Sequence, residues 1–128
     1  GIVELLTRLA DAGWLLGVAT GKSDRGLISC LEGHGIRDRF ITLQTADRHP
    51  SKPDPAMLHA ALTEAGVAPA DAVMIGDTSF DMEMAQAAGV RAIGVAWGYH
   101  PPEELIACGA VGVANSWQEL EGMIHGRA

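Results

Sequence analysis

The feature that most constrains the fold is a regular alternation of helical patterns with short, uninterrupted apolar runs. Apolar residues recur at helical spacing from Val3 to Ala10, and Trp14 to Ala19 then form a strand-like run. The same alternation predicts helices at 24–32, 56–65, 79–88, 103–107 and 116–124, and strands at 40–43, 72–75, 91–96 and 110–113. Strands that are apolar on both faces and alternate with helices are typical of a parallel sheet covered on two sides. The sequence therefore predicts an α/β fold of three layers.

Length and charge narrow the classes of function. A chain of 128 residues, 48% apolar and 20% charged, can bury one core, so we expect a single domain over residues 1–128. The net charge of −7 and nine scattered basic residues argue against a nucleic-acid partner, which would need clustered Lys and Arg. No apolar stretch approaches the roughly 18 residues that span a bilayer, and the acidic start does not resemble a signal peptide. We expect a cytoplasmic protein without a membrane partner, and its oligomeric state is left open.

The two cysteines do not indicate a metal site or a disulfide. Cys30 and Cys108 are far apart, and each lies among Leu, Ile, Ala and Gly, where a small buried apolar residue would fit. Because neither a CxxC pair nor a Cys/His cluster is present, the spacing does not support zinc binding. We expect both thiols to be reduced.

Polar residues follow the first predicted strand. In α/β proteins, ligand-binding and catalytic residues lie just beyond the carboxyl ends of the strands. Thr20-Gly21-Lys22-Ser23 offers a hydroxyl and backbone N–H groups at a helix N-terminus, which suit an anionic phosphate. The same segment could be an ordinary turn with Ser23 as the N-cap. It is not a nucleotide P-loop, because the first glycine of that motif would fall on Leu16 inside the strand.

Two further segments carry charged residues suited to phosphate or metal chemistry. Lys52 lies between Ser51 and two prolines that stiffen its loop, so its ammonium could be held against a phosphate, although a loop lysine can also be simply solvated. Asp77 ends a strand, and Asp81 follows four residues later in the first turn of a helix. Two carboxylates at that offset can face one pocket and suit Mg²⁺. Equally, Asp77 or Thr78 could cap the helix while Asp81 complements its dipole.

Taken together and in this order, these segments resemble the haloacid dehalogenase superfamily, in particular its phosphoglycolate-phosphatase-like branch. Val18-Ala19-Thr20 with Gly-Lys-Ser resembles the family's second motif, Lys52 in Lys-Pro-Asp-Pro its third, and Gly76-Asp77-Thr78 with Asp81 its fourth. The resemblance covers essentially the whole chain and implies a Rossmann-like core. It implies a magnesium-dependent phosphatase of small phosphorylated metabolites that acts through an aspartyl-phosphate.

The resemblance also implies roles for individual residues. Thr20 and Lys52 would be catalytic, and the phosphate would be bound by Thr20, Gly21, Lys22 and Lys52. Asp77 and Asp81 would hold the Mg²⁺, with Asp77 as a direct ligand and Asp81 acting through water or by orienting Lys52. A phosphomutase would need cap residues that this sequence does not show. A dehalogenase would not need the two acids.

One motif of the family does not occur. No Asp-x-Asp is present, and neither Asp11 in a helical repeat nor Asp47 on a loop can replace the nucleophilic aspartate. We therefore expect a core that is incomplete at its N-terminus, lacking the nucleophile strand and the cap domain and inactive as it stands. That strand would lie between the strands that end at Thr20 and Asp77. The alternative is a non-catalytic anion-binding or interaction module with the same fold.

The histidines share no metal-ligand spacing, and only His49, beside Pro50, lies near the inferred pocket. The segment from Trp97 to Pro101 resembles a loop that often borders the active site in this family. For Trp97 and Tyr99 themselves we expect roles in packing and in the turn.

Overall fold

The computed structural model describes residues 2–98 and 100–126. The chain divides into two compact units, Gly1–Val67 and Ala68–Ala128. Each unit contains its own parallel sheet, and each is described by itself.

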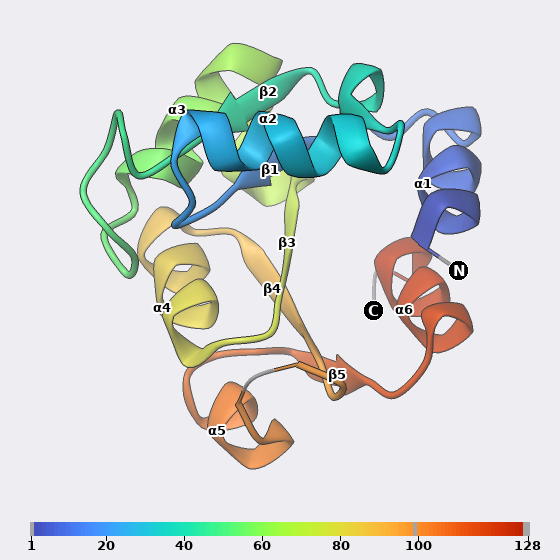
Figure 1. Cartoon of the computed structure of the whole chain (residues 1–128). Helices are drawn as coiled ribbons and strands as arrows, with labels where there is room; N and C mark the ends of the chain where they lie inside the picture. The colour runs from blue at the N-terminus through green and yellow to red at the C-terminus, as the bar shows by residue number, and fades with distance from the viewer. Residues whose placement is uncertain (1, 99, 127–128) are drawn as a thin grey trace. The chain divides into compact units, whose positions relative to one another are not determined.

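The first unit is a two-stranded parallel sheet with helices against it (Figure 1). Strands β1 and β2 pair with Val18 opposite Leu43. The elements in chain order are α1 (Ile2–Asp11), β1 (Gly17–Ala19), α2 (Asp24–Gly33), η1 (Arg37–Arg39), β2 (Thr42–Gln44) and α3 (Ala56–Ala65). Helix α3 packs against both strands.

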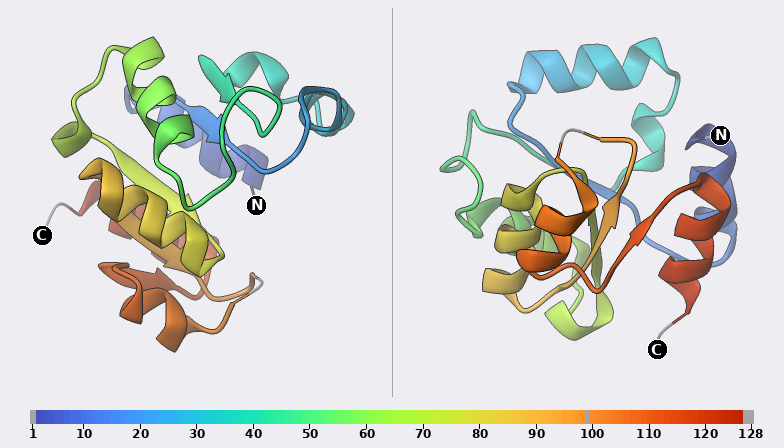
Figure 2. Two further views of the ribbon diagram at one scale, coloured as in Figure 1. Left: turned by 90° about the vertical axis from the view of Figure 1, so that its left-hand side faces the viewer. Right: turned by 90° about the horizontal axis from the view of Figure 1, so that it is seen from below.

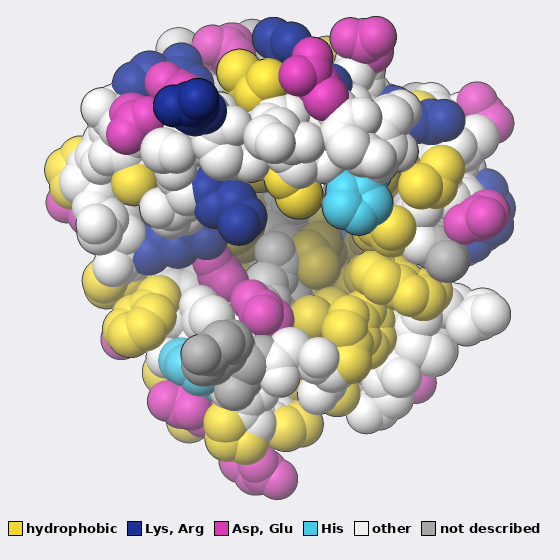
Figure 3. All heavy atoms as spheres, in the orientation of Figure 1, with side chains coloured by type: hydrophobic (Ala, Val, Ile, Leu, Met, Phe, Trp, Pro, Cys, Tyr) yellow, Lys and Arg dark blue, Asp and Glu magenta, His cyan; other side chains and the backbone are white. Residues whose placement is uncertain are grey.

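Helix α2 covers this sheet through a small apolar core. Leu27 and Leu31 of α2 are buried with Ile36, and Val18 and Leu43 of the two strands pack against them. The outer surface of α2 is charged, and Figure 3 shows acidic and basic side chains intermixed over the face on which α2 lies.

The second unit is a three-stranded parallel sheet in the order β3-β4-β5. Helices α4 and α5 lie on one face and α6 on the other, as both views show (Figures 1 and 2). The elements are η2 (Pro69–Asp71), β3 (Val73–Gly76), α4 (Ser79–Ala88), β4 (Arg91–Val95), α5 (Pro102–Ala107), β5 (Gly112–Ala114) and α6 (Trp117–His125). The predicted α/β architecture, with helices on both faces of parallel sheets, is thereby confirmed.

The central strand β4 carries the core of the second unit. Ile93 is fully buried, and Leu105 of α5 is fully buried against the strand. A Cβ built at Gly94 would lie 2.7 Å from Leu105 Cδ1, so the absence of a side chain at Gly94 lets α5 approach the sheet. This close contact fixes α5 and the loop that leads into it.

The predicted helices match the structure closely, whereas the strand ends shift. Helices 56–65 and 79–88 have the predicted bounds. The first strand begins at Gly17 rather than Trp14, because the Trp14 amide donates to Leu9 O and closes the end of α1. The second strand is Thr42–Gln44 rather than 40–43, because the 3₁₀ turn at Arg37–Arg39 precedes it.

Several other expectations can be compared with the structure. Cys30 and Cys108 are free thiols, as expected, but Cys30 is exposed, so its expected burial is wrong. It occupies an outward position on α2, whose buried positions are Leu27 and Leu31. Among residues 2–98 and 100–126, no helix combines the length and apolar character that crossing a membrane requires.

The single domain and the additional central strand stay predictions. In the part of the chain that the structure describes, β1 pairs only with β2, and β3 pairs only with β4. Both strands therefore have an edge at which a further strand could add its backbone hydrogen bonds.

Replacing the side chain that joins α5 to β4 tests this account of the second unit. We expect Leu105→Ala to lower the free energy of unfolding by about 2–5 kcal/mol, because it leaves a cavity at a fully buried site. Ile106→Ala, the adjacent residue with 49% exposure, is the matched control and should change stability by less than about 0.5 kcal/mol. Urea unfolding of the two variants measures both values, and equal effects would contradict this packing.

Candidate functional site

The turn after β1 is joined to the loop after β2 by backbone hydrogen bonds. The Thr20 amide donates to Gln44 O at 3.0 Å, and the Ala46 amide donates to Lys22 O at 3.2 Å. Within the turn, the Lys22 amide donates to Thr20 Oγ1 at 3.2 Å. A Cβ built at Gly21 would have no atom within 4 Å, so the turn has open space at this glycine. The carboxyl ends of both strands are thus held together around Thr20.

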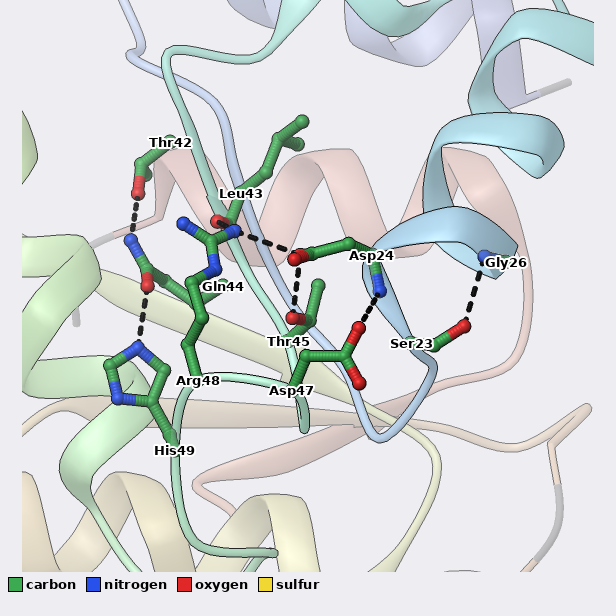
Figure 4. A network of polar contacts seen from close by, with 10 residues as sticks. All are labelled: Ser23, Asp24, Gly26, Thr42, Leu43, Gln44, Thr45, Asp47, Arg48 and His49. Atoms are coloured by element: carbon green, nitrogen blue, oxygen red, sulfur yellow. Dashed lines mark hydrogen bonds and ion pairs between the residues drawn. The ribbon is translucent and has the colours of Figure 1, made fainter.

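Side chains of the protein already occupy much of the N-terminus of α2 (Figure 4). Ser23 Oγ accepts from the Gly26 amide at 3.1 Å, and Asp47 Oδ2 accepts from the Asp24 amide at 2.8 Å. The N-cap interpretation of Ser23 is therefore confirmed. A phosphate at this turn would have to use other groups, such as Thr20 and the Gly21 amide, and its binding there stays a prediction.

Asp24 anchors this arrangement from the first turn of α2 (Figure 4). Its Oδ1 accepts from the fully buried Thr45 hydroxyl at 2.7 Å and from Arg48 at 3.1 Å. Arg48 also donates to Leu43 O at 2.6 Å. The hydroxyl of Thr45, and then the positive charge of Arg48, lower the pKa of Asp24 below its ordinary value of 3.8. This network links the turn after β1 to the loop that leads toward Lys52.

His49 takes part in a second, largely buried chain of hydrogen bonds. Its Nε2 lies 2.7 Å from Gln44 Oε1, and Gln44 Nε2 donates to Thr42 Oγ1 at 2.9 Å. Gln44 and Thr42 are each 4% exposed. These contacts give His49 a structural role within the first unit.

The loop that carries Lys52 is ordered by local turns. The Asp54 amide donates to Ser51 O at 3.1 Å, and Asp54 Oδ1 accepts from the Ala56 amide at 2.9 Å, where α3 begins. The peptide bond between Lys52 and Pro53 is cis, and Lys52 itself is half-buried. The contact of Lys52 with phosphate stays a prediction.

The acidic segment after β3 forms a capping box at the start of α4. The Thr78 hydroxyl accepts from the Asp81 amide at 3.2 Å, and Asp81 Oδ2 accepts from the Thr78 amide at 3.3 Å. The same Oδ2 also accepts from the Asp77 amide and the Thr78 hydroxyl, at 3.3 and 3.1 Å. Asp81 is 4% exposed, whereas Asp77 is half-buried at the end of the strand. The two carboxylates therefore lie in different environments.

These environments bear on the expected magnesium site. In the described parts of the chain, no three side chains among His, Cys, Asp and Glu are grouped closely enough to hold a metal. Mg²⁺ usually keeps several waters and takes one or two protein carboxylates together with phosphate oxygens. Asp77 fits such a partial site. Oδ2 of Asp81 is committed to three donors, which favours the expected indirect role over direct coordination.

The loop after β4 lies against Asp77. A Cβ built at Gly98 would overlap the Asp77 side chain and lie 2.8 Å from its Oδ2, so only glycine fits there. Trp97 packs on Trp117 with ring centroids 4.7 Å apart, which confirms its expected packing role. The expectation for Tyr99 lies outside the described residues.

His100 is the residue that sequence reasoning missed. Its Nδ1 accepts from the Ser79 amide at 2.9 Å, and its own amide donates to Asp77 O at 3.1 Å. Neither contact follows a sequence spacing, because 21 positions separate His100 from Ser79. The only available signal was the resemblance of its loop to one that borders active sites.

The structure thus forms two local groups among the predicted site residues. One turn of the first unit carries Thr20, Gly21 and Lys22, and a separate loop of the same unit carries Lys52. The capping box of the second unit contains Asp81, and Asp77 precedes it. The meeting of both groups around one phosphate stays a prediction.

Removing the Thr45 hydroxyl tests the network at Asp24. We expect Thr45→Val to raise the pKa of Asp24 toward 3.8, because the donor with the largest effect on it is lost. Since the pKa of Asp24 in the folded protein is lowered, its stabilising contribution is present above pH 3.8 and is lost as the pH falls through the folded value. The variant should therefore lose less stability than the wild type over that acid range.

The measurement is a carboxyl ¹³C titration of Asp24 with urea unfolding at each pH. Thr63→Val, on the exposed side of α3, is the matched control. An unchanged Asp24 pKa in Thr45→Val would contradict the assigned cause.

Comparisons with known proteins show which family this chain belongs to. The family model for haloacid dehalogenase-like hydrolases matches residues 1–95. The chain is 37% identical over 127 residues to the probable phosphatase IndB of Dickeya dadantii, covering 98% of this chain and 55% of that protein. It is 36% identical over 121 residues to the phosphoglycolate phosphatase of Rhodospirillum rubrum, covering 94% and 50%.

Solved structures agree with these relatives. A predicted phosphatase from Clostridium acetobutylicum superposes with a TM-score of 0.89 at 32% identity, covering 97% of this chain and 58% of the other. A hydrolase from Pseudomonas syringae superposes with a TM-score of 0.89 at 26% identity, covering 100% and 60%. The chain spans about half the length of the curated relatives. Residues 1–128 belong to the haloacid dehalogenase-like hydrolase family.

Proposed function

We propose that this chain is the motif-bearing part of a magnesium-dependent phosphatase that hydrolyses small phosphorylated metabolites. The observation that carries the proposal is the contrast between Asp77 and Asp81. Asp81 is buried and accepts three hydrogen bonds at the start of α4, while Asp77 stands half-buried at the carboxyl end of β3. One fixed and one more accessible carboxylate suit a Mg²⁺ that is shared with a phosphate.

The proposed reaction proceeds in two displacements at phosphorus. An aspartate carboxylate attacks the phosphorus atom of the ester and the P–O bond to the leaving group breaks. The leaving oxygen takes a proton from solvent water and departs as the alcohol. Water then attacks the aspartyl-phosphate and releases inorganic phosphate and the free carboxylate. The nucleophile of this reaction would come from a segment outside these 128 residues, since no Asp-x-Asp occurs within them.

The chain's own residues would bind and orient the transferring phosphoryl group. The Thr20 hydroxyl, the amides of Gly21 and Lys22 and the Lys52 ammonium would contact its oxygens, where fixed donors stabilise developing charge. The Lys22 amide donates to Thr20 Oγ1 in the structure, so it would have to exchange that bond to contact phosphate. Asp77 would hold the metal, which supplies positive charge against the phosphoryl oxygens, and Asp81 would fix the backbone beneath it.

The relatives support a small phosphorylated substrate. Beside the phosphoglycolate phosphatases, a pyrophosphatase of Bacillus velezensis is 38% identical over 98 residues. The substrate class, the absence of nucleic-acid and membrane partners and a cytoplasmic location are part of this proposal.

A second candidate function is a non-catalytic anion-binding or interaction module. The lack of an Asp-x-Asp in the sequence favours it. Under this hypothesis the turn at Thr20 and the loop of Lys52 would bind anions without turnover.

The first test is the intact mass of the protein purified from its source, compared with the 13.4 kDa of this chain. We expect a heavier protein that hydrolyses p-nitrophenyl phosphate and 2-phosphoglycolate with Mg²⁺ and loses this activity with EDTA. A mass of 13.4 kDa without turnover would instead support the module.

Replacing Asp77 tests the proposed metal ligand in the active protein. We expect Asp77→Asn to lower kcat/KM by about 100-fold or more, because a charge that holds the metal is lost. Glu64→Gln, an exposed acid on α3, is the matched control and should keep wild-type activity. Full activity of Asp77→Asn would exclude this residue as the ligand.

A further inference from the structure

His100 connects three parts of the second unit around Asp77. Its amide donates to the Asp77 carbonyl at 3.1 Å, and its Nδ1 accepts from the Ser79 amide at 2.9 Å. The first contact fixes the peptide group of Asp77, and the second satisfies an N–H group in the first turn of α4. One residue of the loop after β4 thus holds the backbone on both sides of Thr78.

Burial and packing keep the His100 ring in this position. The side chain is 21% exposed, and its ring meets Phe80 edge-on with centroids 5.8 Å apart. Glu104 Oε2 lies 3.7 Å from the same Nδ1, beyond the 2.9 Å of the Ser79 contact. Because the Ser79 amide donates to Nδ1, this nitrogen acts as a hydrogen-bond acceptor.

Gly98, two positions before His100, makes the arrangement specific to Asp77. The space that a side chain at Gly98 would need is filled by Asp77, so the loop lies directly against that carboxylate. Asp81 fixes the Asp77 amide from the helix side, while His100 fixes the Asp77 carbonyl from the loop side. The backbone of Asp77 is therefore held at both its N–H and its C=O.

We propose that His100 is a positioning residue, which holds Asp77 in the orientation that binds Mg²⁺ by capping Ser79 and clamping the loop after β4. The proposal rests on the proposed function, because it takes Asp77 as the metal ligand. His100 itself does not contact the metal. Its side chain acts as a hydrogen-bond acceptor, so another side chain with an acceptor at the same distance from the backbone should replace it.

The experiment uses the heavier protein expected under the proposed function, with MgCl₂ in the presence of inorganic phosphate, followed by ¹H–¹⁵N NMR. In the wild type, Mg²⁺ should shift the amides of Asp77 and Thr78 in a saturable way, and Asp77→Asn should abolish the shift. His100→Ala should weaken Mg²⁺ binding about 5- to 10-fold and increase hydrogen exchange of the Ser79 amide by a similar factor, as expected for one lost hydrogen bond.

Two polar replacements separate positioning from a general loss of packing. His100→Asn places its Oδ1 where Nδ1 stood and should restore both Ser79 protection and Mg²⁺ affinity to within about twofold of the wild type. His100→Gln carries its acceptor one bond farther out and should behave like His100→Ala. His59→Ala, an exposed histidine on α3, controls for the loss of an imidazole.

The outcomes distinguish this proposal from the function on which it rests. If the wild-type protein shows no saturable Mg²⁺ shift at Asp77 in the presence of phosphate, the metal site fails and the positioning role fails with it. If the wild type binds Mg²⁺ and His100→Ala binds it equally well, only the positioning role is overturned. Failure of His100→Asn to restore affinity while it restores Ser79 protection would also overturn it.

Discussion

The buried carboxylate of Asp81 is the constraint on which the acidic segment depends. Its Oδ2 accepts hydrogen bonds from the Asp77 amide, the Thr78 amide and the Thr78 hydroxyl. A buried carboxylate is costly unless such donors compensate for the lost water, so the backbone at the start of α4 must keep this conformation. Gly76 permits it, because a Cβ there would lie 2.6 Å from that Oδ2. The backbone conformation at Asp77 is thus a consequence of the burial of Asp81.

In the first unit, too, a carboxylate accepts a hydrogen bond from a backbone amide at the start of a helix. The Asp47 carboxylate accepts from the Asp24 amide at the N-terminus of α2, and Asp24 in turn accepts from Thr45 and Arg48. In both units an acidic side chain satisfies N–H groups that a helix start would otherwise leave without a partner. The chain therefore uses several of its carboxylates to shape the turns after its strands.

The sequence predicted the parts of the fold that depend on local pattern. Helices at 56–65 and 79–88 were found because their apolar spacing ends at Gly66 and Gly89, which adopt positive φ at the C-caps. Strand ends were less accurate, since the hydrogen bond from the Trp14 amide to Leu9 O, which closes α1, takes Trp14 out of the first strand. The bond from His100 to Ser79 could not be predicted, because it joins loops that only the sheet brings together. The Ser23 cap was expected from sequence, but the use of Asp47 on the same helix was not.

Because the net charge of the chain is negative, its affinity for a phosphate ligand would depend on these local arrangements. At a net charge of −7 the chain offers no long-range attraction to a phosphate ester, and salt screens most distant charges beyond about 10 Å. The sequence contains only two lysines, Lys22 and Lys52, and both lie in the segments that resemble phosphate-binding motifs. Arg48, the basic residue nearest to these segments in the loop, is paired with Asp24. Affinity for phosphate would therefore come from a few fixed contacts, and the hydrogen bonds that order these turns would set its strength.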